Sequence, residues 1–548
     1  MQTDTIAIRT ETPKSSSPIG RVVPVDRPSA IALVADNSLA AEAAVRHYKP
    51  NAMDIYLLGI TLVISGQFFS WNLGLGAGLY TYLIIYAIMA LAYTTFCCCV
   101  SEVTSALPFA GGSYGLARCT LGFFPAFLIG CCEAVEYISS VAVIVIGMTD
   151  MCVSIQPSLK SYKPLLWLLY YVPATAIQIV GGSGFWIFNL AVGAFSLIVL
   201  LIHCFGVLPL VDFSKHALAD STQMYVGGFS QAMYVFPFSA WFFLGIEAMG
   251  LSSRDLERPK TQVPAAQVTC IVSLVITGIF AFLTTVSLPV DGGIATIAGA
   301  LAPLSNGFMQ VLKISSNAAI ALSIPPQYAA AFGLSWAASK LVNAMASSKL
   351  LPPSLAVTSQ RYGTPHIAIV LNAVLGYGVC LMVYFVPKTT VYILPVCLLF
   401  AFTSYSGQCM GYISLKLGYP LTNQSAFKNP FGIVGAVYAL CVWVTGIVAI
   451  LGFQGNDGAE ALFFLAVLVV LVIYYQLVAG KRQIMSEEES KILLVAHILR
   501  FNASKKSRYS SKQSSKPSRV SVSHTRPMGA TPKSQGATST AGDGTHPH

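Results

Sequence analysis

The chain has 548 residues, of which 55% are hydrophobic and only 10% are charged, and its mean hydropathy is +0.67. Soluble domains carry roughly 25% charged residues, so this composition excludes a soluble globular protein. The net charge of +10 lies mostly in the two tails and in one set of loops. This distribution is typical of positive-inside membrane topology and argues against nucleic-acid binding.

Apolar runs of about 20 residues, the length that crosses a bilayer, recur from residue 56 to residue 479. Residues 1–50 and 480–548 are polar and predict a disordered N-terminal tail and a Ser/Lys-rich C-terminal tail around a transmembrane domain at 51–479. With an even number of spans, both tails are expected on the cytoplasmic side, and the expected location is the plasma membrane. The runs predict an all-α, polytopic protein with twelve spans, near residues 55–79, 80–103, 121–149, 164–182, 185–210, 229–251, 263–288, 325–347, 365–385, 389–415, 430–453 and 459–479.

Two spans contain stretches that should interrupt a membrane helix. The first carries VISGQFF at residues 63–69, and the sixth carries PFSAWFFLGIE at residues 237–247. In hydrocarbon an unpaired backbone group costs several kcal/mol, so a broken helix is tolerated only where protein or a polar cavity covers it. Broken helices at matching positions in two halves of a chain indicate the binding site of a transporter. Free amides there can bind an anionic or polar group, and free carbonyls can bind an ammonium.

Three strings in order along the chain resemble the amino acid–polyamine–organocation permeases, over roughly residues 53–479. They are the Ser65-Gly66 break, the pattern E-x5-P-x2-GG-x-Y at residues 102–114, and ASKLVNAMA at 338–346 followed by LLP at 350–352 and YGTP at 362–365. Within that family, VISGQFFSWN at 63–72 and the aromatic residues near 236–243 look most like ethanolamine permeases. The resemblance implies an inverted five-plus-five repeat of the LeuT type with two added helices, and alternating access around a site at the bilayer midplane.

The resemblance also implies roles for residues at the two breaks. The amides of Ser65 and Gly66 would bind the polar end of a substrate, and carbonyls near Leu62 and Leu244 would bind its amine. Trp241 would stack over the substrate as a gate, where its ring can attract an ammonium. Glu247 would brace the second half of the sixth span. The substrate-contacting residues expected at the breaks are Ile64, Ser65, Gly66, Gln67, Phe68, Trp241, Phe243, Leu244 and Gly245.

The sequence departs from the family pattern in three places. Ile64 stands where many amino acid permeases have a glycine, and its side chain should hinder the approach of a carboxylate to the backbone. This favours an amino alcohol or an unusual amine over a standard α-amino acid. Ser196 aligns with a lysine that replaces a sodium ion in some members, so that proton-carrying device is absent. Residues 347–349 read Ser-Ser-Lys instead of Arg-Asp-Gly, so inner-gate contacts are expected to differ.

Ionisable residues inside the predicted spans are costly in a membrane and indicate function or mutual pairing. Glu136 is either a counter-charge or proton carrier for an amine, or a structural carboxyl. Glu133 lies three residues away on about the same helix face, which suits proton coupling. Lys340 is expected to pair with Glu102 or Glu247 near the inner gate. The coupling or gating candidates are therefore Glu102, Glu133, Glu247 and Lys340, and His203 is interpreted as packing rather than as a proton relay.

These features predict a secondary active transporter that imports a small amine-bearing solute, an amino acid or an ethanolamine-like compound. A proton or sodium gradient would drive it. We find no nucleotide-binding loop, metal cluster or nucleophile–base arrangement in the sequence, so we expect neither an enzyme nor a cofactor. Two alternatives stay open: a nutrient sensor built on a transporter fold, and a channel for small amines. The expected partners are the solute and the lipid bilayer.

Overall fold

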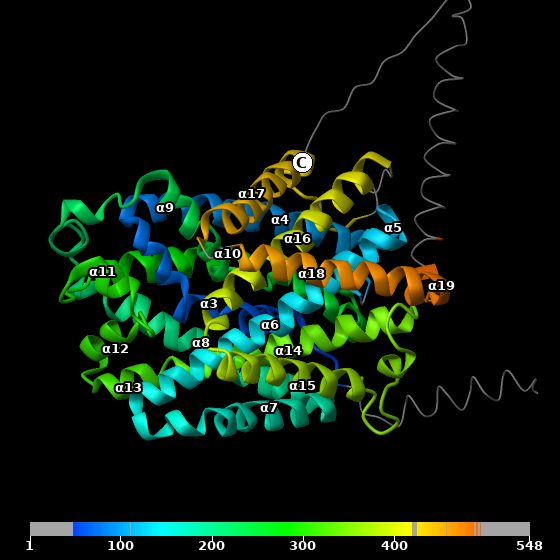
Figure 1. The fold of residues 1–548 in the computed structure, drawn as a ribbon, viewed down its shortest axis with the longest axis horizontal. Helices are drawn as coiled ribbons and strands as arrows, with labels where there is room; N and C mark the ends of the chain where they lie inside the picture. The colour runs from blue at the N-terminus through cyan, green and yellow to red at the C-terminus, as the bar shows by residue number, and fades with distance from the viewer. Residues whose placement is uncertain are drawn as a thin grey trace, which may run out of the picture.

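The elements of the computed structural model follow the apolar runs of the sequence. The structure describes residues 48–109, 111–418, 425–455, 458–486, 489–490 and Leu494, and every regular element in these ranges is a helix. The predicted all-α, polytopic architecture is therefore confirmed (Figure 1). Nearly all of the predicted N-terminal tail and most of the C-terminal tail lie outside the described residues.

Nine helical segments among the described residues are long and apolar enough to cross a membrane. One of them is the sixth predicted span, Gly228–Asp255, which is built from several shorter helices. The other eight contain the helices α4 (Leu79–Ala106), α6 (Phe123–Ile155), α8 (Gly182–Gly206), α10 (Pro259–Val286), α15 (His366–Phe385), α16 (Thr389–Gly418), α17 (Gly432–Phe453) and α18 (Ala459–Tyr474).

Three further segments account for the other predicted spans. The helix α14 (Ile324–Ser347) qualifies as a tenth span when it is joined to the short helices before it, although the chain bends by 119° between them. The fourth predicted span is α7 (Lys163–Val180), and the first is divided between α2 (Ala52–Val63), α3 (Ser65–Phe68) and a 3-10 helix, Trp71–Ala77. Neither α7 nor any helix of the divided first span is by itself long and apolar enough to count among the membrane-spanning candidates.

The beginning of α2 shows how sequence fixes a helix end. The Asn51 side chain accepts hydrogen bonds from the amides of Met53 and Asp54, while the Asp54 carboxylate accepts one from the Asn51 amide at 2.8 Å. This capping box satisfies amides that have no partner within the helix. The Tyr48 hydroxyl also donates to Asp54 at 3.0 Å. The first span is thereby fixed at its start.

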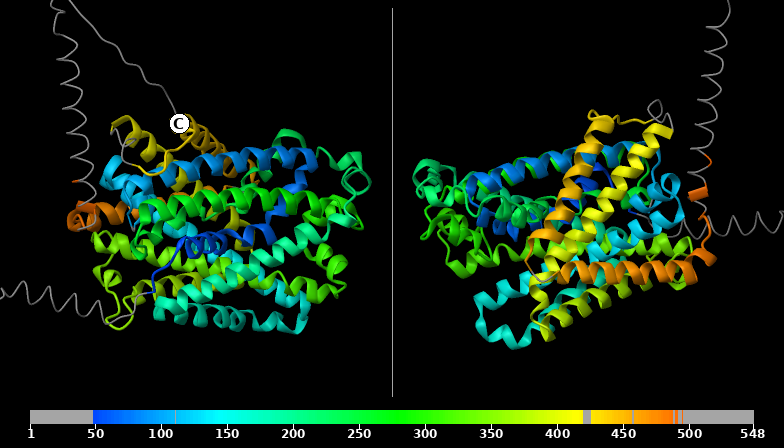
Figure 2. Two further views of the ribbon diagram at one scale, coloured as in Figure 1. Left: turned by 180° about the vertical axis from the view of Figure 1, so that it is seen from behind. Right: turned by 45° about the horizontal axis from the view of Figure 1, so that its top comes forward.

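The two halves of the bundle pack against each other helix by helix. α4 packs against α10, α6 against α14, and α7 against α15, so each of these three helices of the first half meets the one five spans later. This pairing is the one expected of an inverted five-plus-five repeat. The sixth span lies at the centre, because the whole of its apolar window is buried, whereas none of the window of α18 is. Figure 2 shows α17 and α18 on the outside of the bundle.

Several of the short helices lie at the two ends of the bundle. α5 (Gly112–Thr120) and α19 (Gly480–Arg482) lie at one end, which we call the α5 end (Figure 1). The chain enters α2 at this end and leaves the last span there, as an even number of spans requires. The opposite end carries α9 (Gly228–Val235), α11 (Gly293–Ala298), α12 (Ser305–Leu312) and α13 (Ser316–Ala321).

Candidate functional site

The two interrupted spans meet in the middle of the bundle. A Cβ added at Gly66 would lie 1.7 Å from the backbone carbonyl oxygen of Trp241, so only glycine permits this approach. A Cβ added at Gly245 would lie 3.3 Å from the carbonyl oxygen of Leu62. The backbones of the two spans therefore approach each other closely at Gly66 and at Gly245, and the sequence led us to expect that the two spans meet.

The sixth span is clearly interrupted. It forms a 3-10 helix over Phe236–Phe242, turns through Phe243 and Leu244, and resumes as a 3-10 helix over Ile246–Asp255. Gly245 between them has a φ of 93°, in the left-handed region that favours glycine. The interruption allows Glu247 to enter the bundle at the beginning of the second segment, where its side chain is buried.

The first span differs from the expectation in where it breaks. Ser65–Phe68 is a short helix rather than an unwound stretch, because Ile64 keeps right-handed helical angles and accepts a hydrogen bond from the Gln67 amide at 3.1 Å. The stronger departure from helical geometry comes directly after this short helix. Phe69 is extended, and Ser70 has a φ of 67°, which ends the helix before the 3-10 segment begins.

Several buried polar groups near the breaks have hydrogen-bonding capacity left over. The Ser65 hydroxyl donates to the Gln327 side-chain oxygen, and the Gln67 side-chain amide donates to the Leu274 carbonyl at 3.0 Å. The Gln67 Oε1, Gln327 Nε2 and Trp241 Nε1 atoms are buried without a protein partner. Buried polar atoms in native proteins are normally satisfied, so these atoms are available to a bound molecule or to water.

A hydrogen-bonded chain of carboxyl and hydroxyl groups lies beside the second break. The Tyr137 hydroxyl is 2.7 Å from Glu133 Oε1 and 2.9 Å from Glu247 Oε1, and the Ser113 hydroxyl of α5 donates to the other Glu133 oxygen. Tyr137 has a single proton to donate, so the second of its two contacts is a hydrogen bond only if that carboxyl carries a proton. The chain therefore joins α5, α6 and the sixth span, and all of its contacts are hydrogen bonds only when one of its carboxyl groups is protonated.

Glu136 points to a different neighbour from Glu133. Its Oε1 accepts a hydrogen bond from the Tyr405 hydroxyl of α16. Both Glu136 and Glu247 are buried, and the Oε2 atom of each has no protein partner. The two carboxyl groups thus have free acceptors in a region from which water is largely excluded.

A group of aromatic rings that includes Tyr405, the hydrogen-bond donor to Glu136, lies near this pair of carboxyl groups. The Phe243 ring lies 5.3 Å from Tyr93, which is 4.8 Å from Trp443 and 5.9 Å from Tyr405 between ring centroids. Tyr405 and Trp443 are in turn 5.4 Å apart. We call these four residues the aromatic cluster. Rings beside unpaired carboxylate oxygens form a site suited to a cation, because ring faces and carboxylates both attract positive charge.

Comparison with known proteins fits this geometry. A model of the amino acid permease family matches residues 58–489. The chain belongs to the amino acid permease family. It is 24% identical over 331 residues to an uncharacterized transporter of Rhizobium meliloti (strain 1021), a match covering 58% of this chain and 69% of the relative. It is 23% identical over 428 residues to the methylthioribose transporter of Bacillus subtilis (strain 168), covering 72% and 87%. The protein is thus an integral, multi-pass membrane permease.

The pairing expected for Lys340 of the permease is wrong. Its ammonium group contacts both carboxylate oxygens of Asp255 at 3.0 Å, because α14 packs against the end of the sixth span. Glu102 instead binds Lys416 at 2.7 Å and accepts from Tyr412 at 2.7 Å, both in α16. Both networks lie at the α5 end of the permease rather than at its centre.

The remaining predicted residues are buried but differ in their surroundings. Ile64, Phe68 and Leu244 pack in the core beside the breaks. Ser196 donates to the Val192 carbonyl of its own helix at 2.6 Å. His203 is buried, with Nε2 3.2 Å from the Thr285 hydroxyl, on the side of α8 that faces α10 and α12. None of these contacts links His203 to the carboxyl groups at the breaks.

Sequence reasoning missed four residues of the site, Tyr93, Gln327, Tyr405 and Trp443. It also missed that Tyr137 bridges two carboxyl groups. Tyr137 lies four residues after Glu133, a spacing that places the two side chains together on a helix, so its contact was available from the sequence. The other four come from α4, α14, α16 and α17. Their contribution depends on how distant helices pack, for which the chain carries no local signal.

Proposed function

We propose that this permease moves a small solute bearing a positively charged nitrogen, and that movement is coupled to protons. The amine class rests on one observation: the free carboxylate oxygens of Glu136 and Glu247 lie beside the aromatic cluster at the second break. Burying carboxylates without a counter-charge is costly, so a cation of some kind must neutralise them. An ammonium group bound between rings and carboxylates meets that requirement.

Proton coupling is supported by the chain Glu133–Tyr137–Glu247. Its geometry needs a proton on one carboxyl, and loss or gain of that proton changes the charge beside the solute. When the amine binds, the positive charge favours release of the proton, and when the amine leaves, a proton can return. Such an exchange moves the proton and the amine in opposite directions, so amine uptake should be driven by a proton gradient directed out of the vesicle.

The amide groups at the first break favour a second, uncharged class of solute. Gln67 Oε1 and Gln327 Nε2 can hydrogen-bond hydroxyl groups, and one relative is named a methylthioribose transporter. A polyhydroxylated solute could use these groups without needing the carboxylates. The two classes make opposite predictions about Glu136, because only the amine requires its negative charge.

The deciding experiment is uptake by purified permease in proteoliposomes. The competition panel contains ethanolamine, choline, methylthioribose, and neutral, basic and acidic amino acids, each with a proton gradient, with a sodium gradient and with none. Saturable uptake of an amine, dependent on the proton gradient and lost in Glu136→Gln, supports the proposal. Uptake of methylthioribose that survives in Glu136→Gln would replace it with the uncharged solute. Binding without uptake would instead indicate a sensor, and non-saturating flux would indicate a channel.

A further inference from the structure

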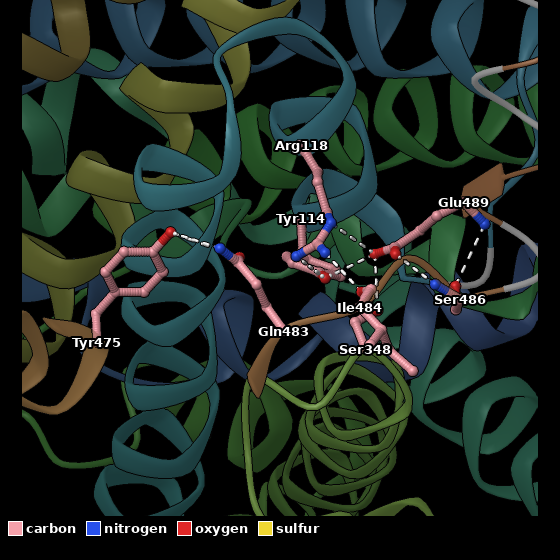
Figure 3. Close-up of polar contacts among 8 residues, drawn as sticks. All are labelled: Tyr114, Arg118, Ser348, Tyr475, Gln483, Ile484, Ser486 and Glu489. Atoms are coloured by element: carbon pink, nitrogen blue, oxygen red, sulfur yellow. Dashed lines mark hydrogen bonds and ion pairs between the residues drawn. The ribbon is translucent and has the colours of Figure 1, made fainter. Parts of the chain in front are cut away.

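The chain beyond the last span folds back onto the α5 end. The Ile484 amide donates to the Ser348 carbonyl at 3.1 Å, and the Ile484 carbonyl accepts from Arg118 Nη2 at 2.7 Å (Figure 3). Ser348 ends α14, and Arg118 lies in α5. Two backbone groups of this segment thus connect elements that are 230 residues apart in the sequence.

Glu489 continues this connection as a buried carboxylate. Its Oε1 accepts hydrogen bonds from the Tyr114 hydroxyl at 2.7 Å and the Ser348 hydroxyl at 2.8 Å, and lies 3.3 Å from Arg118 Nε (Figure 3). The Glu489 and Arg118 side chains are each only 1% exposed. Its second oxygen accepts from the Ser486 amide at 2.8 Å, and the Ser486 hydroxyl accepts from the Glu489 amide. One side chain therefore accepts a hydrogen bond from the backbone of its own segment and joins α5 to α14.

α5 lines a small cavity next to Glu247. A cavity of about 30 Å³, room for one or two water molecules, lies between Glu247 and residues of α4, α5 and α16. α5 contributes Ser113, Leu116 and Cys119 to its lining. Ser113 also donates to Glu133, so α5 is bonded to the carboxyl chain on one side and, through the next residue, Tyr114, to Glu489 on the other.

Glycines with a positive φ stand at both ends of α5. The helix is nine residues long, begins at Gly112, which has a φ of 55°, and is followed by Gly122, which has a φ of 99°. A Cβ added at Gly122 would meet no atom within 4 Å, so the glycine there serves the backbone conformation rather than close packing. Short elements bounded by such residues are common hinges in conformational changes.

We propose that Ile484, Ser486 and Glu489 form a latch that holds α5 against α14 and keeps the α5 end of the permease closed. We define the latch as these three residues with their contacts to Tyr114, Arg118 and Ser348. The proposal rests on transport by alternating access, because a closed end must open in each cycle. Release of Glu489 frees α5 to swing away from the cavity below Glu247. The segment follows the last span, so it can detach without removing any transmembrane helix.

Cys119 of α5 reports this opening directly. Burial, together with the nearby Glu489 carboxylate, raises the pKa of its thiol to about 11, so very little of the reactive thiolate exists near neutral pH. Ten of the other twelve cysteines are buried, and replacing Cys152 and Cys441 with serine removes the two that are not. In this background we measure the rate of maleimide labelling of purified, detergent-solubilised permease at pH 7.5.

We expect labelling of Cys119 to accelerate at least about tenfold in Glu489→Gln and after truncation at Arg482, because the thiol becomes hydrated and its pKa falls toward the ordinary value. Ser348→Ala, which removes one of the donors, should give a smaller increase. Glu257→Gln is the matched control, since this glutamate lies at the same end and is 55% exposed in its contact with Lys49. Equal labelling in the latch variants and in the control would overturn the proposal.

The truncation protects the test against a folding defect. Glu489→Gln leaves Arg118 buried with a weakened partner, whereas truncation exposes Arg118 to solvent. If the point variant aggregates, the labelling rate of a monodisperse truncated protein tests the latch instead. Amine uptake is measured separately and should rise several-fold on truncation, because gate opening often limits turnover. If no variant takes up any solute of the panel, the amine proposal fails while the labelling rates still decide the latch.

Discussion

Gly66 of the first span lies directly against the carbonyl of Trp241 in the sixth. No side chain separates the two backbones at this point, since a Cβ at residue 66 would be 1.7 Å from that oxygen. The contact holds the two spans together close to Phe243 and Glu247, which follow Trp241 along the sixth span.

Gly66→Ala should therefore destabilise the permease severely. Overpacking of a core by a methyl group typically costs about 1–3 kcal/mol, and here the clash is with backbone that cannot rotate away. We expect a lower melting temperature of the detergent-solubilised protein and loss of uptake. Gly76→Ala is the matched control, because its Cβ would lie 3.7 Å from the nearest atom, in the side chain of Gln231. Equal melting temperatures for the two variants would contradict this account of the contact.

Tyr137→Phe should disconnect the two carboxyl groups that the hydroxyl joins. Glu133 and Glu247 would each lose a hydrogen bond, at 2.7 and 2.9 Å, while the packing of the ring is retained. A buried acceptor left without a hydrogen bond generally costs about 1–3 kcal/mol of free energy. We therefore expect impaired transport and an altered pH dependence. The measurement is the pH profile of uptake between pH 5 and pH 8.

Tyr438→Phe serves as the control for that experiment. Its hydroxyl donates to the Ile88 carbonyl at 3.0 Å in the contact between α17 and α4, and it contacts no carboxyl group of the site. It should lower stability modestly and leave the pH profile unchanged. If the two variants shift the profile equally, the Glu133–Tyr137–Glu247 chain has no part in coupling.

The ion pair between Lys340 and Asp255 should contribute little to stability. Both side chains are about one quarter exposed, at 24% and 26%, so water screens their attraction. A double-mutant cycle with Lys340→Met and Asp255→Asn should give a coupling free energy of about 0.2–1 kcal/mol, from unfolding of the solubilised protein. A coupling free energy several times larger would mean that this pair closes the α5 end as strongly as the latch is proposed to do.

The break in the sixth span was predictable from sequence because it depends on local chemistry. Pro237 lacks an amide hydrogen and Gly245 permits a positive φ, so both mark an interruption without reference to the rest of the fold, whereas Gly66 permits close approach within a helix. The exact break in the first span was not predictable. Ile64 keeps a helical conformation, and the helix ends only at Phe69 and Ser70. The next residue, Trp71, packs against Phe242 and Phe282.

Partners across the bundle were the part that sequence reasoning could not provide. The choice of Lys340 between Glu102, Glu247 and Asp255 depends on how far α14 is shifted along the sixth span, and a shift of one helical turn, about 5.4 Å, changes the partner. Glu489 shows the same limit. It lies in a polar stretch whose composition predicts a solvent-exposed tail, yet its carboxylate is buried by residues from α5 and α14.

Phe243→Leu should weaken binding of a cationic solute while leaving the fold intact. The substitution keeps an apolar side chain but removes the ring that lies 5.3 Å from Tyr93 in the aromatic cluster. Cation–π attraction at a desolvated site is worth about 1–2 kcal/mol, so the dissociation constant of the amine should rise roughly 5- to 30-fold. Isothermal titration or scintillation proximity binding to purified permease gives this constant directly. Phe280→Leu is the control, since that ring is 38% exposed on α10 and contacts only Phe205 among the described aromatic rings. A solute whose affinity falls equally in both variants, or in neither, does not use the aromatic cluster, and the carboxylates beside it would then have to bind a proton or a metal cation instead of an amine.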